Sequence, residues 1–98
     1  MRLIWSPESR RNLLNIREFI GEQASASRAD AMIERIRAAA RQLQTAPRAG
    51  RKIQPENRDD LRVTRARPFW IYYRIKADAI QVVTVVHYRQ QQPQRLSE

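Results

Sequence analysis

The chain has 98 residues, 42% of them hydrophobic and 30% charged, which is enough for one small globular domain with its own core. It contains no cysteine and one histidine, which excludes disulfides, thiolate zinc sites, a cysteine nucleophile and a multi-histidine centre, so we expect no metal and no cofactor. The formal net charge of +9 favours polyanions or acidic proteins as partners.

The N-terminal residues predict a short strand and carry no membrane signal. Only three apolar residues, at positions 3–5, precede the polar run Ser6-Pro7-Glu8. That stretch is far too short for the apolar region of a signal peptide or for a membrane span. We therefore expect a cytoplasmic protein that does not associate with membranes.

A first helix is expected to begin at Ser6-Pro7-Glu8. A hydroxyl N-cap, a proline in the first turn and an acid near the positive end of the helix dipole all favour a helix start. The helix should run to about Gln23. Three- and four-residue steps give it one apolar stripe, made of Leu13, Ile16, Phe19 and Ile20.

A second helix is predicted to begin at Ser27-x-x-Asp30, which resembles a capping box. Its apolar residues repeat at alternating steps of four and three and are Ala29, Ile33, Ile36, Ala40 and Leu43. The two stripes predict a helical hairpin that covers one face of a sheet. Arg35, Arg37 and Arg41 lie away from this seam and form either a solvated polar face or the edge of a partner site.

Three short strands are expected at residues 61–65, 69–75 and 80–87. The middle strand should be apolar on one face and carry on the other Trp70, Tyr72 and Arg74. The last strand is β-branched on both faces, which predicts a central position, and regular alternation would place on one face Ile80, Val82, Thr84 and Val86. The order predicts an α+β fold: a short N-terminal strand, a helical hairpin, and a three-stranded antiparallel sheet with the helices on one face.

The sheet region is also the candidate partner surface. Residues 61–98 carry seven basic and two acidic groups, a local balance of +5, although a compositional bias of the source genome would also produce an arginine excess. Arginine forks match phosphates and carboxylates bidentately. Trp70 and Tyr72 are either platforms for stacked bases or packing residues at the sheet margin. The expected partner-binding residues are Arg35, Arg37, Arg41, Arg51, Arg62, Arg65, Arg67, Trp70, Tyr72, Arg74 and Arg89.

Five short patterns follow one another along the chain: Trp5-Ser6-Pro7, Pro47-x-x-Gly50-Arg51, Leu61-Arg62, Phe69-x-Ile71-x-Tyr73-Arg74 and Val85-x-His87-x-Arg89. In this order and spacing they resemble the RelE/ParE toxin superfamily over nearly the whole chain. The resemblance implies a single toxin domain over residues 1–98. The glutamine-rich run from Gln90 to Gln94 predicts a flexible tail at residues 90–98. It also implies the toxin half of a bacterial type II toxin–antitoxin pair, held by a cognate antitoxin in a hetero-oligomer.

The RelE-like branch of this superfamily cuts messenger RNA in the ribosome. Under that interpretation Arg65 and Arg89 would hold the phosphate and stabilise developing charge, and His87 would transfer a proton. A single histidine at a strand end is more often a surface or hydrogen-bonded structural residue, so this catalytic assignment belongs only to the endoribonuclease alternative.

Three residues favour the ParE-like branch, which poisons DNA gyrase by binding. Leu61 and Val63 stand where the RelE-like branch has lysines, and Trp70 stands where it has an arginine. The sequence therefore predicts a gyrase inhibitor that is not an enzyme. The alternatives are a ribosome-dependent endoribonuclease and a non-catalytic basic module that binds nucleic acid or protein.

Overall fold

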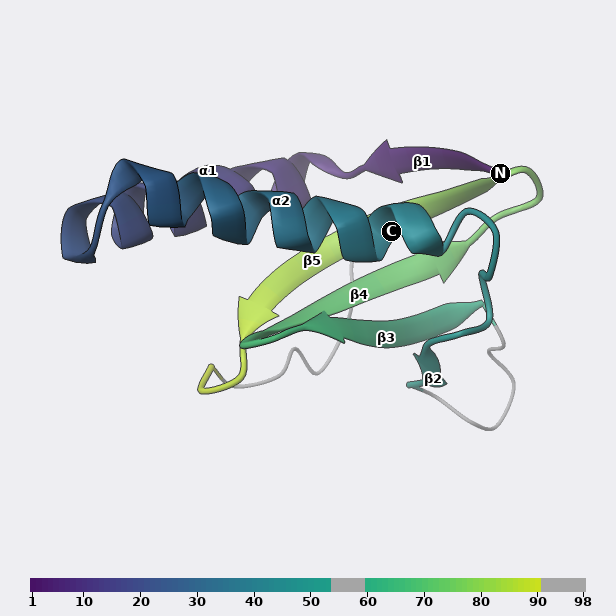
Figure 1. Cartoon of the computed structure of the whole chain (residues 1–98). Helices are drawn as coiled ribbons and strands as arrows, with labels where there is room; N and C mark the ends of the chain where they lie inside the picture. The colour runs from purple at the N-terminus through teal and green to yellow at the C-terminus, as the bar shows by residue number, and fades with distance from the viewer. Residues whose placement is uncertain (54–59, 91–98) are drawn as a thin grey trace.

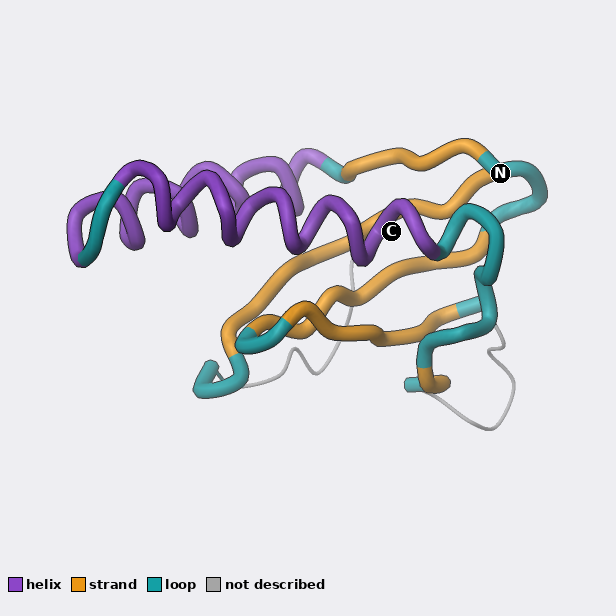
Figure 2. The backbone as a smooth tube through the Cα atoms, in the orientation of Figure 1, coloured by secondary structure: helices purple, strands orange, loops and turns teal. Residues whose placement is uncertain are grey.

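In the computed structural model, which describes residues 1–53 and 60–90, two helices lie side by side across one face of a five-stranded sheet (Figure 1). The elements are β1 (Arg2–Trp5), α1 (Pro7–Gln23), α2 (Ala26–Gln42), β2 (Arg51–Lys52), β3 (Leu61–Ala66), β4 (Phe69–Ile75) and β5 (Ala79–His87). Figure 2 shows the two helices lying along one side of the strands β5, β4 and β3. The predicted α+β fold is confirmed; of the tail predicted to be flexible, residues 91–98 lie outside the described part of the chain.

The sheet has five strands where the sequence predicts three, in the order β1-β5-β4-β3-β2. β1 runs parallel to β5, with Leu3 opposite Ile80, and the two-residue β2 pairs antiparallel with β3. Strands this short carry no local signal of which strand they will pair with. β5 lies between β1 and β4, so its predicted central position is confirmed.

The two helix starts differ in how well the sequence marks them. Ser6 caps α1 as predicted, because its Oγ accepts a hydrogen bond from the Ser9 backbone N–H at 3.0 Å. The predicted start of α2 is wrong: its N-cap is Ser25, whose Oγ accepts from the Arg28 N–H at 3.1 Å. Ser25 has extended backbone dihedrals, and the helix begins directly after it at Ala26. Ser27, the predicted start of the capping box, therefore already lies in the first turn of the helix.

The predicted seam of α2 is buried along its whole length, but the predicted stripe of α1 is only partly covered. Leu13 is buried and Ile16 and Ile20 pack against the core at its margin, whereas Phe19 is 63% exposed. Figure 1 shows why: the end of the hairpin, where α1 meets α2, projects past the ends of the strands. The sheet therefore offers little surface to cover Phe19.

A bulge between β4 and β5 changes the predicted alternation of the last strand. Tyr72 pairs with Thr84 and Tyr73 pairs with Val82, so Val83 is the additional residue. Beyond the bulge it is Val85 that joins Val82 in the core under the helices. The strict alternation predicted for residues 80–86 is therefore wrong after Val82, because it assumed a regular ladder.

Polar contacts from α1 hold this bulge. The Oδ1 atom of Asn12 accepts hydrogen bonds from the Thr84 hydroxyl at 3.0 Å and from the Val85 N–H at 2.9 Å. The Ser6 hydroxyl donates to the Val83 carbonyl at 2.7 Å. The first helix is thus attached to β5 by hydrogen bonds as well as by apolar packing.

Neither helix in the described ranges has the length and apolar character that a membrane crossing requires.

Candidate partner-binding surfaces

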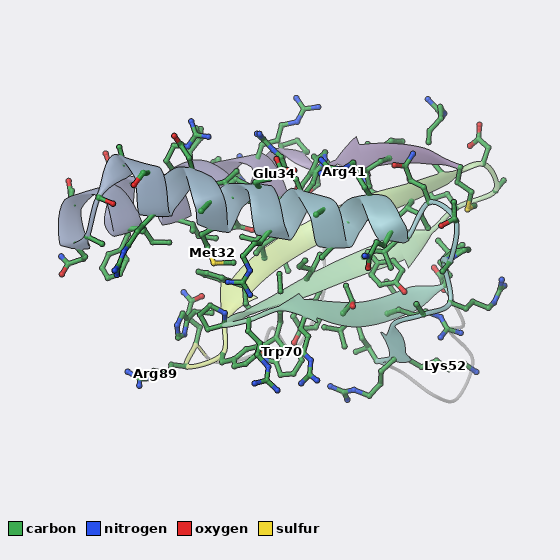
Figure 3. All side chains as sticks on the ribbon, in the orientation of Figure 1. Met32, Glu34, Arg41, Lys52, Trp70 and Arg89 are labelled. Carbon is green, nitrogen blue, oxygen red and sulfur yellow. The ribbon has the colours of Figure 1, made fainter. Side chains whose placement is uncertain are left out.

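The three residues proposed for RNA cleavage are not gathered on one face of the sheet. Arg65 pairs across the ladder with Trp70, and both belong to the face turned away from the helices. His87 pairs with Phe69 on the face that the helices cover. Figure 3 shows Trp70 on the far side of the sheet from the helices, while Arg89 projects from the chain beyond the end of β5. The structure brings His87 and Arg89 together and leaves Arg65 apart from them.

His87 makes local contacts that shape the end of β5. Its ring meets the Phe69 ring edge-on, with centroids 5.3 Å apart and planes at 86°. Its Nδ1 accepts a hydrogen bond from the Arg89 backbone N–H at 3.0 Å, and its own backbone N–H donates to the Gln90 side chain at 2.7 Å. The imidazole therefore closes the turn after the strand.

Arg62 is placed by the sequence on the partner surface, but the structure buries it. Only 7% of the residue is exposed, and its guanidinium donates hydrogen bonds to the carbonyls of Gly50 at 2.8 Å and Arg48 at 3.2 Å. The Tyr73 hydroxyl holds the same segment, donating to Pro47 O at 2.6 Å and accepting from Gly50 N at 2.9 Å. Arg62 and Tyr73 thus fix the connection between α2 and β2 from inside.

The aromatic residues of β4 also pack more deeply than exposed stacking platforms would. Tyr72 is buried, and Trp70 is half-buried against Tyr88, with ring centroids 4.6 Å apart. Burial raises the pKa of the Tyr72 hydroxyl, partly offset by Arg51. The Nε atom of Arg74 lies 3.8 Å from an Asp60 carboxylate oxygen. Tyr88, which sequence reasoning missed, completes the aromatic pair.

The remaining predicted partner residues are exposed but do not form one patch. They are Arg35, Arg37, Arg41, Arg51, Arg65, Arg67 and Arg89. Arg41 forms an ion pair with Glu34 on the outer side of α2 (Figure 3), and Arg35 lies 3.7 Å from the Met32 sulfur. Arg37 faces a different surface, between the two helices.

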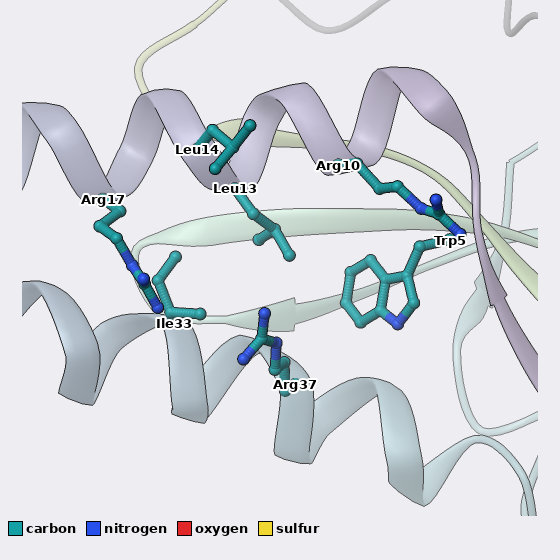
Figure 4. A pocket seen from close by; sticks show the side chains of 7 residues that line it. All are labelled: Trp5, Arg10, Leu13, Leu14, Arg17, Ile33 and Arg37. Carbon is teal, nitrogen blue, oxygen red and sulfur yellow. The ribbon is translucent and has the colours of Figure 1, made fainter.

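That surface is the α1–α2 groove, a hollow of about 330 Å³ lined by Trp5, Arg10, Leu13, Leu14, Arg17, Ile33 and Arg37. Figure 4 shows the indole and the three guanidinium groups between the two helices, with the sheet behind. Sequence reasoning missed Arg10 and Arg17. Their seven-residue spacing, two helical turns, was the available signal that they share a face.

Two further hollows, of about 510 and 230 Å³, are lined in part by the exposed cations Arg51, Arg65 and Arg89. A groove between α1 and the sheet is lined by Asn15, Ile16, Phe19, Ile20, Phe69, His87, Arg89 and Gln90. A hollow at the β2 edge is lined by Ala49, Gly50, Arg51, Val63, Thr64, Arg65 and Trp70. Among the described residues, no three His, Cys, Asp or Glu side chains gather into a group that could hold a metal ion.

Comparisons with known proteins give the family. A family model described as "ParE toxin of type II toxin-antitoxin system, parDE" matches residues 3–92. A chain in the solved structure "Chromosomal ParDE TA system from P. aeruginosa" superposes with a TM-score of 0.75 at 19% identity, covering 89% of this chain and 95% of that chain. This likeness concerns the fold, and no curated protein matches significantly. Because the family model spans nearly the whole sequence, the chain belongs to the ParE toxins of type II toxin–antitoxin systems.

Proposed function

We propose that this toxin inhibits DNA gyrase by binding it, without catalysing a reaction, and that a cognate antitoxin neutralises it in a cytoplasmic hetero-oligomer. Family membership supports the toxin role. One structural observation favours binding over RNA cleavage: Arg65 lies on the opposite sheet face from His87, so these residues do not surround one phosphate. Acid–base catalysis needs its groups within hydrogen-bond reach of the same reacting atoms.

The proposed contact with gyrase is the exposed cationic end of the sheet around Trp70. Arg51 and Arg65 line one hollow with this indole, and Arg67 is exposed beside them in the turn between β3 and β4. A half-buried tryptophan surrounded by arginines is the composition of an interface hot spot, because the indole supplies buried area and the arginines supply directional hydrogen bonds.

A supercoiling assay tests the gyrase proposal. We expect the purified toxin to inhibit the supercoiling of relaxed plasmid by gyrase, and Arg65→Glu to raise the half-inhibitory concentration about tenfold or more. Arg28→Glu is the control, because Arg28 is also exposed but lies at the start of α2, away from the sheet. Unchanged supercoiling at micromolar toxin excess contradicts the proposal.

A second experiment separates the endoribonuclease alternative. We expect His87→Gln to keep gyrase inhibition and growth arrest within about twofold, because the ring serves the turn after β5, as its Nδ1 contact with Arg89 indicates. Messenger RNA should stay intact when the wild-type toxin is induced. Cleaved transcripts in wild-type cells that disappear with His87→Gln would identify the ribosome pathway.

A further inference from the structure

The groove between α1 and the sheet is a mostly apolar hollow of about 510 Å³. On the side of α1 it is lined by Ile16 and Ile20, which are partly buried, and by Phe19, which is 63% exposed. The buried Phe69 lines it from β4. A hollow of this volume is within the usual range for small-molecule sites, and a ligand in it would cover apolar area that Phe19 exposes to water.

Two hydrogen-bond donors line this groove at the end of β5. The Nδ1 atom of His87 accepts from the Arg89 backbone N–H at 3.0 Å, so the neutral imidazole carries its proton on Nε2. Within residues 1–53 and 60–90, no acceptor lies within hydrogen-bond distance of His87 Nε2, and no carboxylate lies within ion-pair distance of the Arg89 guanidinium. Both groups can therefore donate to a ligand in the groove.

The position of the imidazole is fixed before any ligand binds. Its ring packs edge-on against Phe69, with centroids 5.3 Å apart, and the His87 backbone N–H donates to the Gln90 side chain at 2.7 Å. These contacts, together with the bond from the Arg89 N–H, hold the turn after β5. A ligand would thus meet a preformed donor, which lowers the entropy cost of binding.

The chemistry of the groove favours a single acid on an apolar body over nucleic acid. One guanidinium and one imidazole N–H match the two oxygens of a carboxylate, and such charge-assisted hydrogen bonds are stronger than neutral ones. Nucleic acid would require cations spaced along several phosphates and several exposed rings. Among the described residues that line this groove, Arg89 supplies the only guanidinium and Phe19 the only strongly exposed ring.

We propose that the groove between α1 and the sheet binds a small-molecule carboxylate whose apolar body is about the size of decanoate. The carboxylate accepts hydrogen bonds from Arg89 and from His87 Nε2. The apolar body lies along Ile16, Phe19 and Ile20 and supplies affinity, whereas the two donors select an acid over the corresponding alcohol. This ligand site goes beyond the proposed function and does not depend on it.

Calorimetric titration of the full-length toxin with decanoate, kept below its micelle concentration, tests the site. We expect saturable binding of one decanoate per chain, and binding of decanol that is weaker by about tenfold or more, because an alcohol forms no ion pair with Arg89. In an amide NMR spectrum, decanoate should shift the signals of residues 16–20 and 87–90. An absence of saturable binding, or shifts confined to other parts of the chain, would overturn the proposal.

Two pairs of variants test the roles of the charge and of the apolar wall. Arg89→Gln should weaken decanoate binding about tenfold or more, since it removes the charge but keeps the backbone N–H that binds His87. Its control is Lys76→Gln, because Lys76 is an exposed cation at the opposite end of β5. Phe19→Ala should weaken binding about threefold or more. Its control is Leu14→Ala, because Leu14 is 67% exposed on the same helix but outside this groove.

Circular dichroism checks that the four variants remain folded. Equal decanoate affinities for Arg89→Gln and Lys76→Gln would overturn the assignment of the carboxylate to Arg89. A competition experiment examines nucleic acid as the ligand: a single-stranded RNA oligonucleotide should leave decanoate bound, and displacement of decanoate by this RNA at a similar concentration would overturn the small-molecule assignment. A toxin that binds decanoate in the groove but leaves gyrase active would contradict the gyrase proposal alone.

Discussion

The Tyr73 hydroxyl and the Gly50 backbone N–H are joined by a 2.9 Å hydrogen bond across 23 positions of the sequence. The same hydroxyl donates to the Pro47 carbonyl at 2.6 Å, so one buried phenol satisfies two backbone groups of the segment that leads into β2. Because this segment passes next to the hollow that contains Arg51 and Arg65, the geometry of a proposed partner surface depends on an internal contact.

Tyr73→Phe is expected to lower the free energy of unfolding by about 1–3 kcal/mol, because it removes both hydrogen bonds and leaves a donor and an acceptor without a partner. Urea unfolding followed by circular dichroism measures this. Tyr72→Phe is the matched control on the same strand: its buried hydroxyl has no hydrogen-bond partner, so its removal should be neutral or stabilising. An equal decrease in the free energy of unfolding for the two variants would show that the Tyr73 hydrogen bonds do not contribute to stability.

Gly50→Ala is expected to destabilise the fold by about 1–3 kcal/mol, since the new Cβ would lie 2.5 Å from the Tyr73 hydroxyl and 2.8 Å from the Val63 carbonyl oxygen. Gly21→Ala should change the stability in the opposite direction. That position lies in α1 with open space around it, so alanine should stabilise the helix by about 0.5–1 kcal/mol. Thermal unfolding of the two variants side by side measures both effects, and an unchanged midpoint for Gly50→Ala would contradict the close packing.

Arg62 and Arg65 lie on the same strand and should have separable roles. Arg62→Ala is expected to lower stability by about 1–3 kcal/mol, because the carbonyls of Gly50 and Arg48 lose their buried donor. Arg65→Ala should change stability by less than about 0.5 kcal/mol, because this residue is exposed. The second variant should instead weaken gyrase inhibition. Urea unfolding and the supercoiling assay, applied to both variants, distinguish the two roles. A stability loss for Arg65→Ala together with weaker gyrase inhibition for Arg62→Ala would contradict this assignment.

Alkaline pH should destabilise the protein through Tyr73. Burial raises the pKa of this hydroxyl above its ordinary value of 10.0, with the Gly50 hydrogen bond and Arg62 acting in the opposite direction. Above about pH 10 the unfolded chain therefore releases the proton while the folded chain retains it, so stability falls as pH rises through the folded pKa. Absorbance titration at the phenolate band, with unfolding measured from pH 9 upwards, checks this. Tyr73→Phe should make the dependence less steep, with the remainder coming from Tyr72, whose pKa is also raised by burial, and an unaltered slope would exclude Tyr73 as a source.

Apart from the two-residue β2, the elements were predictable because each has a local signature, whereas several contacts between elements were not. The apolar steps of α2 and the alternation of β4 follow from which face meets the core. The pairing of β1 with β5 joins residues nearly eighty positions apart, and no short pattern encodes it. The bulge at Val83 is likewise set by contacts with Asn12 and Ser6 on another element.

The candidate site was predictable in its chemistry but less so in its location. An arginine in a strand pattern indicates a cation, but the pattern does not show whether that side chain is exposed to solvent. Arg62 is buried because the segment from Pro47 to Gly50 packs over it and is held there by hydrogen bonds. Arg10 and Arg17 carry a readable spacing, but their importance depends on the neighbouring Arg37 across the hairpin. Surface hollows depend on which elements become neighbours, and this information is spread over the whole chain.

The parallel pairing of β1 with β5 also bears on how the protein is made. β1 can pair only after β5 has been synthesised, because its hydrogen-bond partners, Ala79 to Val82, lie more than seventy residues later in the chain. Until then the apolar side of the helical hairpin lacks the central strand that covers it. A nascent chain that ends before Val82 therefore lacks the central strand of the sheet, and the toxin reaches its native form only after β5 has been translated.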